Sequence, residues 1–402
     1  MTEESYLQDA YRCRFEANVL ANVETELGVG VVLDKTYFYP GGGGQPADSG
    51  TLGGAAVVAV SRHGENIVHV CDHRIDGIVI GAIDWEGRFD HMQQHTGQHI
   101  LSGALLKRCQ VETTSFHLGP ESSSIQLDVL GLELPALGEA EALANEIVWK
   151  NGEVRTSFMR LDEASNHDLR GAPPERDPLR VVEVEGFDRV ACGGTHVART
   201  GEIGLIKIIG VERQGHGIRL EFLCGKRGLR DYSEKHDVTA QLAKSLGTNR
   251  EDLLATVARL KEVESRDRDR IRQLSGQLLA LTISRLLKEA PIVQNVQIVR
   301  HVFEGWALED VRHLVQELQQ QDRCVALIAV KDEKAHLIFA RSKDLAFDIR
   351  GLLADALAIT GGRGGGRPDM AQGGAPSADR LQAALDFAWN ALLPYLPGGR
   401  TP

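Results

Sequence analysis

The chain has 402 residues, of which 42% are hydrophobic and 25% are charged; this composition excludes a wholly disordered chain and a disulfide scaffold, and the length predicts about two to four domains. The 45 basic and 56 acidic residues give a formal net charge of −11, which excludes nucleic-acid binding through bulk charge, so that an RNA partner would be bound at a local site. The six cysteines form no CxxC pair, and no apolar run has the length of a signal or membrane segment, so we expect a reduced, cytoplasmic protein with no membrane partner.

The first 90 residues predict a β-rich part of the chain. Short β-branched runs such as 55–60 and 67–70 are separated by glycine and aspartate turn signals. Between two such runs lies Gly41-Gly42-Gly43-Gly44-Gln45-Pro46. Four glycines in a row do not suit the centre of a strand, because their backbone entropy is costly to lose. This segment, the glycine motif, is therefore predicted to be a turn.

Residues 91–235 change to a mixed pattern. Apolar and histidine residues that recur on one face predict a helix over 91–106, and a similar spacing predicts a second over 137–150. The segment 166–177 has two prolines in its middle and is predicted to be a loop. The expected strands are 181–184, 203–211 and 218–223.

The longest helical tract is predicted from Asp237 to Glu289. Seven of nine positions counted from Leu253 in alternating steps of four and three are apolar, which is typical of a coiled-coil seam. Glu264 and Asp267 interrupt this seam, where two paired helices would bury like charges. A coiled-coil arm and a long helix packed within a larger domain therefore both remain open.

After Ala290-Pro291 strands and helices alternate, which predicts a separate α/β domain. A glycine loop, 361–366, is expected before the last helix. The expected strands are 296–301, 324–330 and 335–340, and the expected helices are 308–319, 349–359 and 377–392. The predicted fold class is α+β, with a small N-terminal β-barrel over 1–90, an α+β domain over 91–235, a helical arm over 236–290 and an α/β domain over 291–402.

Two pairs of potential metal ligands share one spacing. His95 and His99 stand four residues apart in a predicted helix, so both lie on the same face. Cys192 and His196 follow later, in Cys192-Gly193-Gly194-Thr195-His196, where two glycines break any helix. One cysteine and three histidines form a nitrogen and sulfur ligand set that zinc favours. The sequence therefore predicts one Zn²⁺ ion per chain.

The residues next to the predicted ligands limit the kinds of zinc site that the sequence allows. A metalloprotease of the HExxH type is excluded, because Thr96 stands where the general base would be. A closed structural zinc site remains an alternative, although such sites are more often rich in thiolates. His91 extends the histidine stripe on the predicted helix and could replace a ligand; we place it outside the ligand set, since the two pairs already fill a tetrahedron.

These motifs resemble the editing domain shared by alanyl-tRNA synthetases and the free-standing AlaX editing proteins. The matching segments are 41–46, 88–99, 115–119 and 192–196. The segment Gly364 to Gly374 resembles the DHHA1 domain that ends alanyl-tRNA synthetases. Only ninety residues precede the editing block, and the catalytic DHH motif that elsewhere accompanies DHHA1 is missing. The chain therefore resembles the long form of AlaX.

The resemblance implies a zinc-dependent deacylase that acts in trans on Ser-tRNA(Ala) and Gly-tRNA(Ala). Such an enzyme is needed because a pocket for alanine cannot exclude glycine by size and rejects an added hydroxyl poorly. Within such a site, Thr96, beside the first predicted ligand, is the candidate for reading the seryl hydroxyl, with an ordinary polar helix residue as the alternative, and Gln45 could reach the catalytic site from the glycine motif. Zinc would either activate a bound water or anchor the amino group of the substrate while a free water attacks.

Local charge fits an RNA partner. Segment 199–231 holds seven basic and four acidic residues, so Arg213 and Arg219 are candidate tRNA contacts, with a solvated face as the alternative. Arg363 and Arg367 flank glycines and could clamp a phosphate. By resemblance, the C-terminal domain would hold the tRNA body and form a homodimer. An RNA-binding module with a structural zinc, and a hydrolase for another ester such as Ser-tRNA(Thr), remain the alternative functions.

Overall fold

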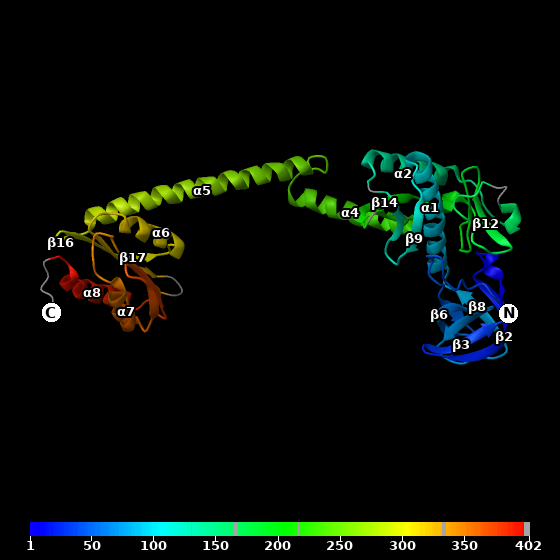
Figure 1. Cartoon of the computed structure of the whole chain (residues 1–402), viewed down its shortest axis with the longest axis horizontal. Helices are drawn as coiled ribbons and strands as arrows, with labels where there is room; N and C mark the ends of the chain where they lie inside the picture. Colours follow the sequence, from blue (N-terminus) through cyan, green and yellow to red (C-terminus); the bar gives the residue numbers. More distant parts are fainter. Residues whose placement is uncertain (130, 165–167, 216, 332–334, 398–402) are drawn as a thin grey trace. The chain divides into compact units, whose positions relative to one another are not determined.

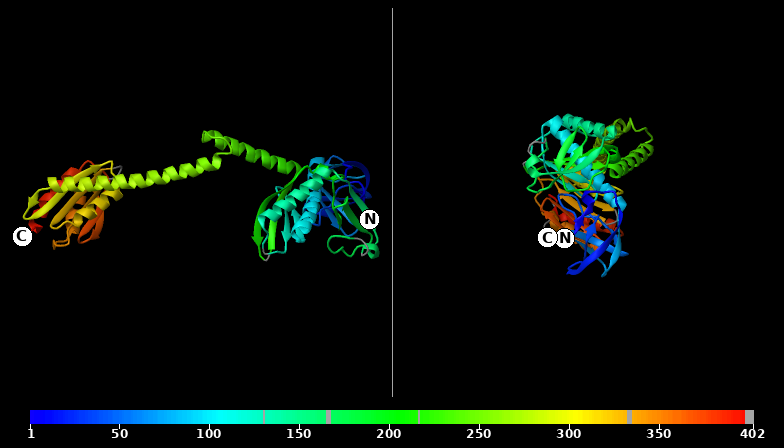
Figure 2. Two further views of the ribbon diagram at one scale, coloured as in Figure 1. Left: turned by 90° about the horizontal axis from the view of Figure 1, so that it is seen from above. Right: turned by 90° about the vertical axis from the view of Figure 1, so that its right-hand side faces the viewer.

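The computed structural model describes residues 1–129, 131–164, 168–215, 217–331 and 335–397. The chain divides into two compact units, 1–250 and 251–402, coloured blue to green and green to red in Figures 1 and 2. Both units combine helices with strands, which confirms the mixed α+β class. Part of the predicted loop 166–177 lies outside the described residues, and its remainder forms no helix or strand.

Six strands at the N-terminus close into a barrel in the order β2-β3-β7-β6-β5-β8, and all neighbours in it are antiparallel. Side chains such as Phe15, Val31 and Ile67 fill its interior. The strands are β2 (Arg14–Thr25), β3 (Gly28–Leu33), β5 (Gly50–Leu52), β6 (Ala55–His63), β7 (Asn66–Cys71) and β8 (Ile78–Ile83). A short parallel pair, β1 (Glu3–Glu4) and β4 (Lys35–Thr36), and the 3-10 helix η1 (Ser5–Leu7) lie outside the barrel order.

The glycine motif forms a tight turn before β5, as predicted. The backbone N–H of Gly42 donates to the carbonyl of Gln45, and Gln45 N–H donates in return to Gly42. Residues 41–44 have φ values of 77°, 122°, 55° and 87°. Side chains other than glycine adopt such values only with strain, which explains the run of four glycines.

Helix α1 (Trp85–Cys109) forms the centre of the first unit (Figure 1). It starts earlier than predicted because the Asp84 side chain caps it by accepting the Glu86 N–H. All residues from Met92 to Leu105 are buried. The helix packs against α2 (Leu134–Lys150) and a sheet in the order β14-β15-β10-β9. These strands are Ile206–Gln214, Gly217–Cys224, Ser123–Leu127 and Thr113–Leu118.

A three-stranded antiparallel sheet leads into the second pair of predicted ligands. Its order is β11-β12-β13, and β13 ends one residue before Cys192. The strands are Val154–Met159, Leu179–Val184 and Asp188–Ala191, with α3 (Leu161–Ala164) after β11 and the 3-10 helix η2 (Thr200–Ile203) further on.

The second unit has a six-stranded sheet in the order β16-β17-β18-β19-β21-β20. Apolar residues alternate between the two faces of the central strand β18: Leu327 packs with α7 and α8, and Ile328 packs with α5 and α6. The strands are Ile292–Val293, Val296–Glu304, Cys324–Lys331, Ala335–Arg341, Met370–Ala375 and Arg363–Arg367. The remaining helices are α6 (Leu308–Gln319), α7 (Ile349–Thr360), α8 (Leu381–Leu392) and η3 (Leu393–Tyr395).

Two details of the sequence analysis are wrong. The continuous tract over 237–289 is divided into α4 (Gly225–Ser245) and α5 (Leu253–Glu289), because Gly247 takes a φ of 61° after the end of α4. The glycine loop 361–366 is largely the edge strand β20, paired with β21. A Cβ at Gly364 would lie 2.4 Å from the carbonyl oxygen of Gln372, so glycine is needed there for close strand contact rather than for a loop.

The seam of α5 is mostly exposed within its own unit. Ile271, Leu278 and Leu281 are more than half exposed, and the buried residues of α5 are Thr256, Thr282 and Leu286. The coiled-coil arm over 236–290 therefore stays a prediction, as does the four-part division of the chain. Among the described helices, none is long and apolar enough to span a bilayer.

Candidate metal centre

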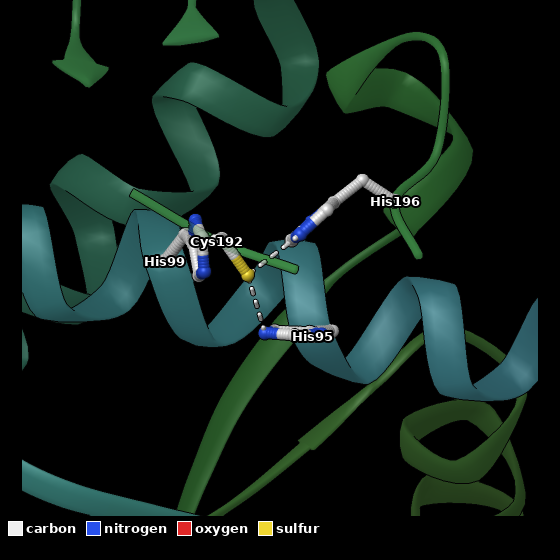
Figure 3. Close-up of side chains that lie close together, drawn as sticks. All are labelled: His95, His99, Cys192 and His196. Carbon is white, nitrogen blue, oxygen red and sulfur yellow. Dashed lines mark hydrogen bonds between the residues drawn. The ribbon is translucent and has the colours of Figure 1, made fainter. Parts of the chain in front are cut away.

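Three histidines and one cysteine from distant segments meet beside α1 (Figure 3). His95 and His99 project from α1, whereas Cys192 and His196 belong to the loop after β13. One potential ligand atom of each residue lies within 4.8 Å of those of the others. The Nε2 atoms of His95 and His196 are 3.4 and 3.3 Å from Cys192 Sγ. The structure therefore brings together all four residues of the predicted ligand set.

The loop that carries Cys192 is held by Arg180 on β12. The Nη1 group of Arg180 donates to the carbonyls of Cys192 and Gly194, at 2.8 and 2.9 Å. Gly194 N–H lies 3.5 Å from Cys192 Sγ. These contacts turn the thiol and the His196 ring toward α1, which two glycines alone would not do.

Gln45 reaches this centre from the glycine motif. Its Oε1 accepts from Thr195 N–H at 3.1 Å and lies 2.7 Å from His95 Nδ1. A backbone N–H can only donate, so the atom facing it is the amide oxygen, and His95 Nδ1 must carry a proton. The lone pair of His95 therefore stays on Nε2, the atom that faces Cys192 Sγ.

Thr96 contacts His196, another residue of the cluster, at the Nδ1 atom of its ring. Its Oγ1 lies 3.1 Å from His196 Nδ1 and accepts from Val197 N–H at 3.1 Å. The side chain is fully buried. Thr96 thus orients the His196 ring, and its role in reading a seryl hydroxyl stays a prediction.

Burial sets the charge state of the four side chains. It lowers the pKa values of His95 and His196 well below their usual value and that of His99 to about 3, so the imidazoles are neutral. Burial also raises the pKa of the Cys192 thiol, against the opposing effects of Gly194 N–H and Arg180. His99 Nδ1 is buried and has no hydrogen-bond partner in the described part of the chain. Neutral imidazoles, a thiol and an orphaned ring nitrogen together fit a metal ion.

A buried ion pair joins α1 to Asp48, two residues after the glycine motif. Both Arg88, on α1, and Asp48, which closes the turn by accepting from Tyr39 N–H, are almost completely buried. Arg88 Nε is 3.0 Å from Asp48 Oδ1, and its other nitrogens donate to the carbonyls of Ala10 and Tyr37. Gln45 and His95 are therefore carried by two segments that this pair holds together.

Sequence reasoning missed the roles of Arg88, Asp48 and Arg180. Arg88 is the first residue of the segment 88–99 that carries the family resemblance. An arginine in the first turn of a buried helix needs an acidic partner, and this requirement could have indicated a buried ion pair. Arg180 gives no such signal, because its partners are backbone carbonyls of the 3-10 helix η1 and of the loop after β13.

The remaining predicted residues lie elsewhere. His91 is on α1 outside the four-residue cluster, with a buried Nδ1 that has no partner among the described residues. Arg213 is exposed at the end of β14, and Arg219 on β15 lies 3.7 Å from Glu221. Arg363 and Arg367 are exposed at the two ends of β20 in the second unit, and Arg367 pairs with Asp369.

Adding a methyl group at Gly194 is expected to weaken metal binding by about 10- to 100-fold. A Cβ there would lie 2.2 Å from His95 Cε1 and 2.7 Å from Gln45 Oε1, so the ring would turn and lose its partner. Competition with a chromophoric chelator measures the zinc affinity of Gly194→Ala. Gly193→Ala is the matched control, because nothing lies within 4 Å of a Cβ at Gly193. Equal affinities for the two variants would contradict this assignment.

Zinc affinity is expected to rise about tenfold per pH unit between about pH 6 and 8. The lowered pKa values of the histidines leave them neutral in this range, so they release no proton. The raised pKa of Cys192 leaves it a thiol, so zinc displaces one proton when it binds. The same chelator competition, repeated along the pH series, measures the slope. A slope near two would mean that a histidine is still protonated, and a slope of zero that the thiolate is preformed.

Two family models match the chain. Residues 294–393 match the DHHA1 domain, and residues 179–220, which include Cys192 and His196, match the second additional domain of threonyl and alanyl tRNA synthetases.

Related proteins match nearly the whole chain. An alanine–tRNA ligase of Pyrococcus abyssi is 30% identical over 96% of this chain and 43% of the ligase, so the chain spans less than half the length of such ligases. The alanyl-tRNA editing protein AlaX-L of Pyrococcus horikoshii is 29% identical over 93% of this chain and 94% of that protein. Among solved structures, the C-Ala domain of Aquifex aeolicus alanyl-tRNA synthetase is 25% identical, with a TM-score of 0.25, and covers 26% of this chain and 97% of that domain.

Proposed function

Because the predicted resemblance to the long form of AlaX is confirmed along nearly the full length of both chains, we propose that this protein is a trans-editing deacylase. It hydrolyses the ester of Ser-tRNA(Ala) and Gly-tRNA(Ala) and depends on one zinc ion per chain. The observation that carries the proposal is the convergence of His95, His99, Cys192 and His196 on one buried point. Three neutral imidazoles and one thiol are nitrogen and sulfur donors of the kinds that bind zinc.

Each residue around the centre has a separate task. When bound, zinc supplies a Lewis acid beside the ester. Gln45 keeps the His95 proton on Nδ1 and so leaves Nε2 free as a ligand. Arg180 holds the Cys192 carbonyl and, with it, the thiol. The burial of the cluster excludes bulk water, and the reaction consumes one water and releases the amino acid and the free ribose hydroxyl.

Thr96 is the proposed selector for serine. If His196 carries its proton on Nδ1, this N–H and Val197 N–H would both donate to the Thr96 oxygen, and Nε2, which faces Cys192 Sγ, would be the atom left to hold a metal. The hydroxyl proton of Thr96 is then left to donate to another acceptor. A seryl side chain offers such an acceptor and glycine does not, so removal of this hydroxyl should affect the serine substrate more.

The tRNA body is the proposed partner of residues 291–402. This region contains the matched DHHA1 domain, and the exposed Arg363 and Arg367 border its edge strand. Arg213 and Arg219 would contact the acceptor end, and a homodimer through the C-terminal region is part of the same proposal. Phosphate contacts of this kind would make tRNA affinity fall steeply with salt.

The direct test is deacylation of purified tRNA(Ala) mischarged with serine, by the zinc-loaded chain and by the chain treated with a chelator. We expect the ester to be lost only with the zinc-loaded chain, and activity to return with added zinc. Persistence of the ester at enzyme excess would refute the proposal. Parallel reactions with Gly-tRNA(Ala) and Ser-tRNA(Thr) separate this substrate choice from its alternatives.

A further inference from the structure

A small cavity opens beside the one metal-site residue that is not fully buried. Its volume is about 220 Å³, and its wall includes Cys192 together with Phe158 and Arg180. The three histidines of the cluster are almost completely buried, whereas Cys192 is partly exposed. Among the four residues of the cluster, Cys192 is the one that borders the cavity.

Three residues of different chemical type, Phe158, Arg180 and Cys192, are neighbours in the wall of this cavity. Phe158 on β11 is directly opposite Arg180 on β12, and Arg180 is next to Cys192, whose N–H donates to its carbonyl. Directly opposed residues in a sheet project on the same side, and neighbouring strands lie about 4.8 Å apart. Phe158, Arg180 and Cys192 thus stand on three neighbouring backbone segments, and the outer two segments lie roughly 10 Å apart.

The Phe158 ring is available for stacking. It is 49% exposed although it is a large apolar side chain, and Pro174 and Pro178 stand beside it in the cavity wall. Leu179 and Val181, which alternate with Arg180 along β12, pack in an apolar cluster of their own, and Leu179 also borders the cavity. The exposed ring therefore belongs to the cavity and not to the core of the sheet.

The charges of the cavity favour an anion. Arg180 is 7% exposed and, among the described residues, donates to carbonyls and has no carboxylate partner. Arg176 adds an exposed guanidinium, and Asp177, which accepts from Leu161 N–H, is the acidic residue of the cavity wall. The cavity wall thus holds two arginines and one aspartate, and its net charge is positive. A positive site next to an aromatic ring suits a nucleotide, which has both a phosphate and a base, better than a free amino acid.

We propose that this cavity binds the 3′-terminal adenosine of the acylated tRNA, with the base on Phe158 and the phosphate toward Arg176. The proposal rests on the deacylase function proposed above and names the part of the substrate that enters first. The ribose would then lie between Phe158 and Cys192 and bring its ester to the metal centre. Base stacking on an aromatic side chain tolerates any base, so the cavity positions the end of the tRNA and does not choose the tRNA.

The test uses a cytidine-cytidine trinucleotide that ends in 2-aminopurine riboside, a base whose fluorescence is quenched by stacking. We expect the zinc-loaded full chain to quench it, and Phe158→Ala to weaken binding about 10-fold and to lose the quenching. Trp149→Ala is the matched control, because Trp149 is 72% exposed on α2 and is absent from the cavity wall. Arg176→Gln should weaken binding and reduce its salt dependence.

Deacylation kinetics provide the second readout. Phe158→Ala should raise KM about 10-fold for Ser-tRNA(Ala), with zinc content and kcat unchanged. If the wild-type chain is active but does not quench the probe, or if Phe158→Ala quenches it as the wild type does, the adenosine site is refuted while the deacylase stands. If the probe is quenched through Phe158 but mischarged tRNA is not hydrolysed, the deacylase function fails and the nucleotide site stands.

Discussion

Replacing Cys192 by alanine is expected to lower the deacylation rate at least ~100-fold and to remove bound zinc. Even the outer partners of metal ligands contribute about 10- to 100-fold to metal affinity or activity, and Cys192 is the only sulfur in the cluster. Its Sγ lies within 3.4 Å of two histidine nitrogens, so its loss leaves three neutral imidazoles. Zinc content by mass spectrometry and single-turnover hydrolysis of Ser-tRNA(Ala) measure the two effects.

The matched control for this substitution is Cys109→Ala. Cys109 is also a partly buried free thiol, but it lies at the end of α1 outside the cluster. Its replacement should leave zinc content and rate unchanged. A folded Cys192→Ala that keeps its activity would refute a catalytic metal, whereas loss of folding with unchanged tRNA affinity would favour a structural zinc.

Replacing Arg88 by methionine is expected to destabilise the first unit by about 3–5 kcal/mol. The substitution leaves the Asp48 carboxylate buried without its cation, because both side chains are almost fully excluded from solvent. It also removes the donors to the carbonyls of Ala10 and Tyr37. Hydrogen exchange read by mass spectrometry resolves the barrel peptides from the second unit, and protection of β2 to β8 should fall.

An exposed ion pair of the same barrel is the control for this effect. Arg74 and Asp76 are more than half exposed, so Arg74→Met should change stability by less than about 1 kcal/mol. The double variant Arg88→Met with Asp48→Leu should recover much of the loss, because it removes the uncompensated charge. A loss as small as that of Arg74→Met would mean that the buried pair contributes little.

The positions of most helices and strands followed from periodicity. The buried strand β18 was visible as an apolar run, and α2 as residues three or four apart. The predictions failed at two glycine-containing segments, 361–366 and 237–289, because a glycine can mark a turn, a helix end or a close contact between strands. Gly364 stands in a strand because a neighbouring backbone approaches it, whereas Gly247 follows the end of α4, inside the tract 237–289 that was predicted as one helix. Local sequence does not contain the approach of a neighbouring strand, so the two uses of glycine look alike.

In the candidate metal centre, too, local sequence predicted some features and the packing of distant segments decided the others. His95 and His99 share a helix face, and Cys192 and His196 repeat their spacing, so chemistry and local geometry were enough to predict which four side chains cluster. Which atoms orient them depended on segments brought together by folding: Gln45 from a turn, Arg180 from a strand and Asp48 through its pair with Arg88. Ligand identity is a property of side-chain chemistry and spacing, which a sequence states directly. Tautomer, ring orientation and the cavity beside Cys192 are properties of packing between distant segments, and only the tertiary structure decides them.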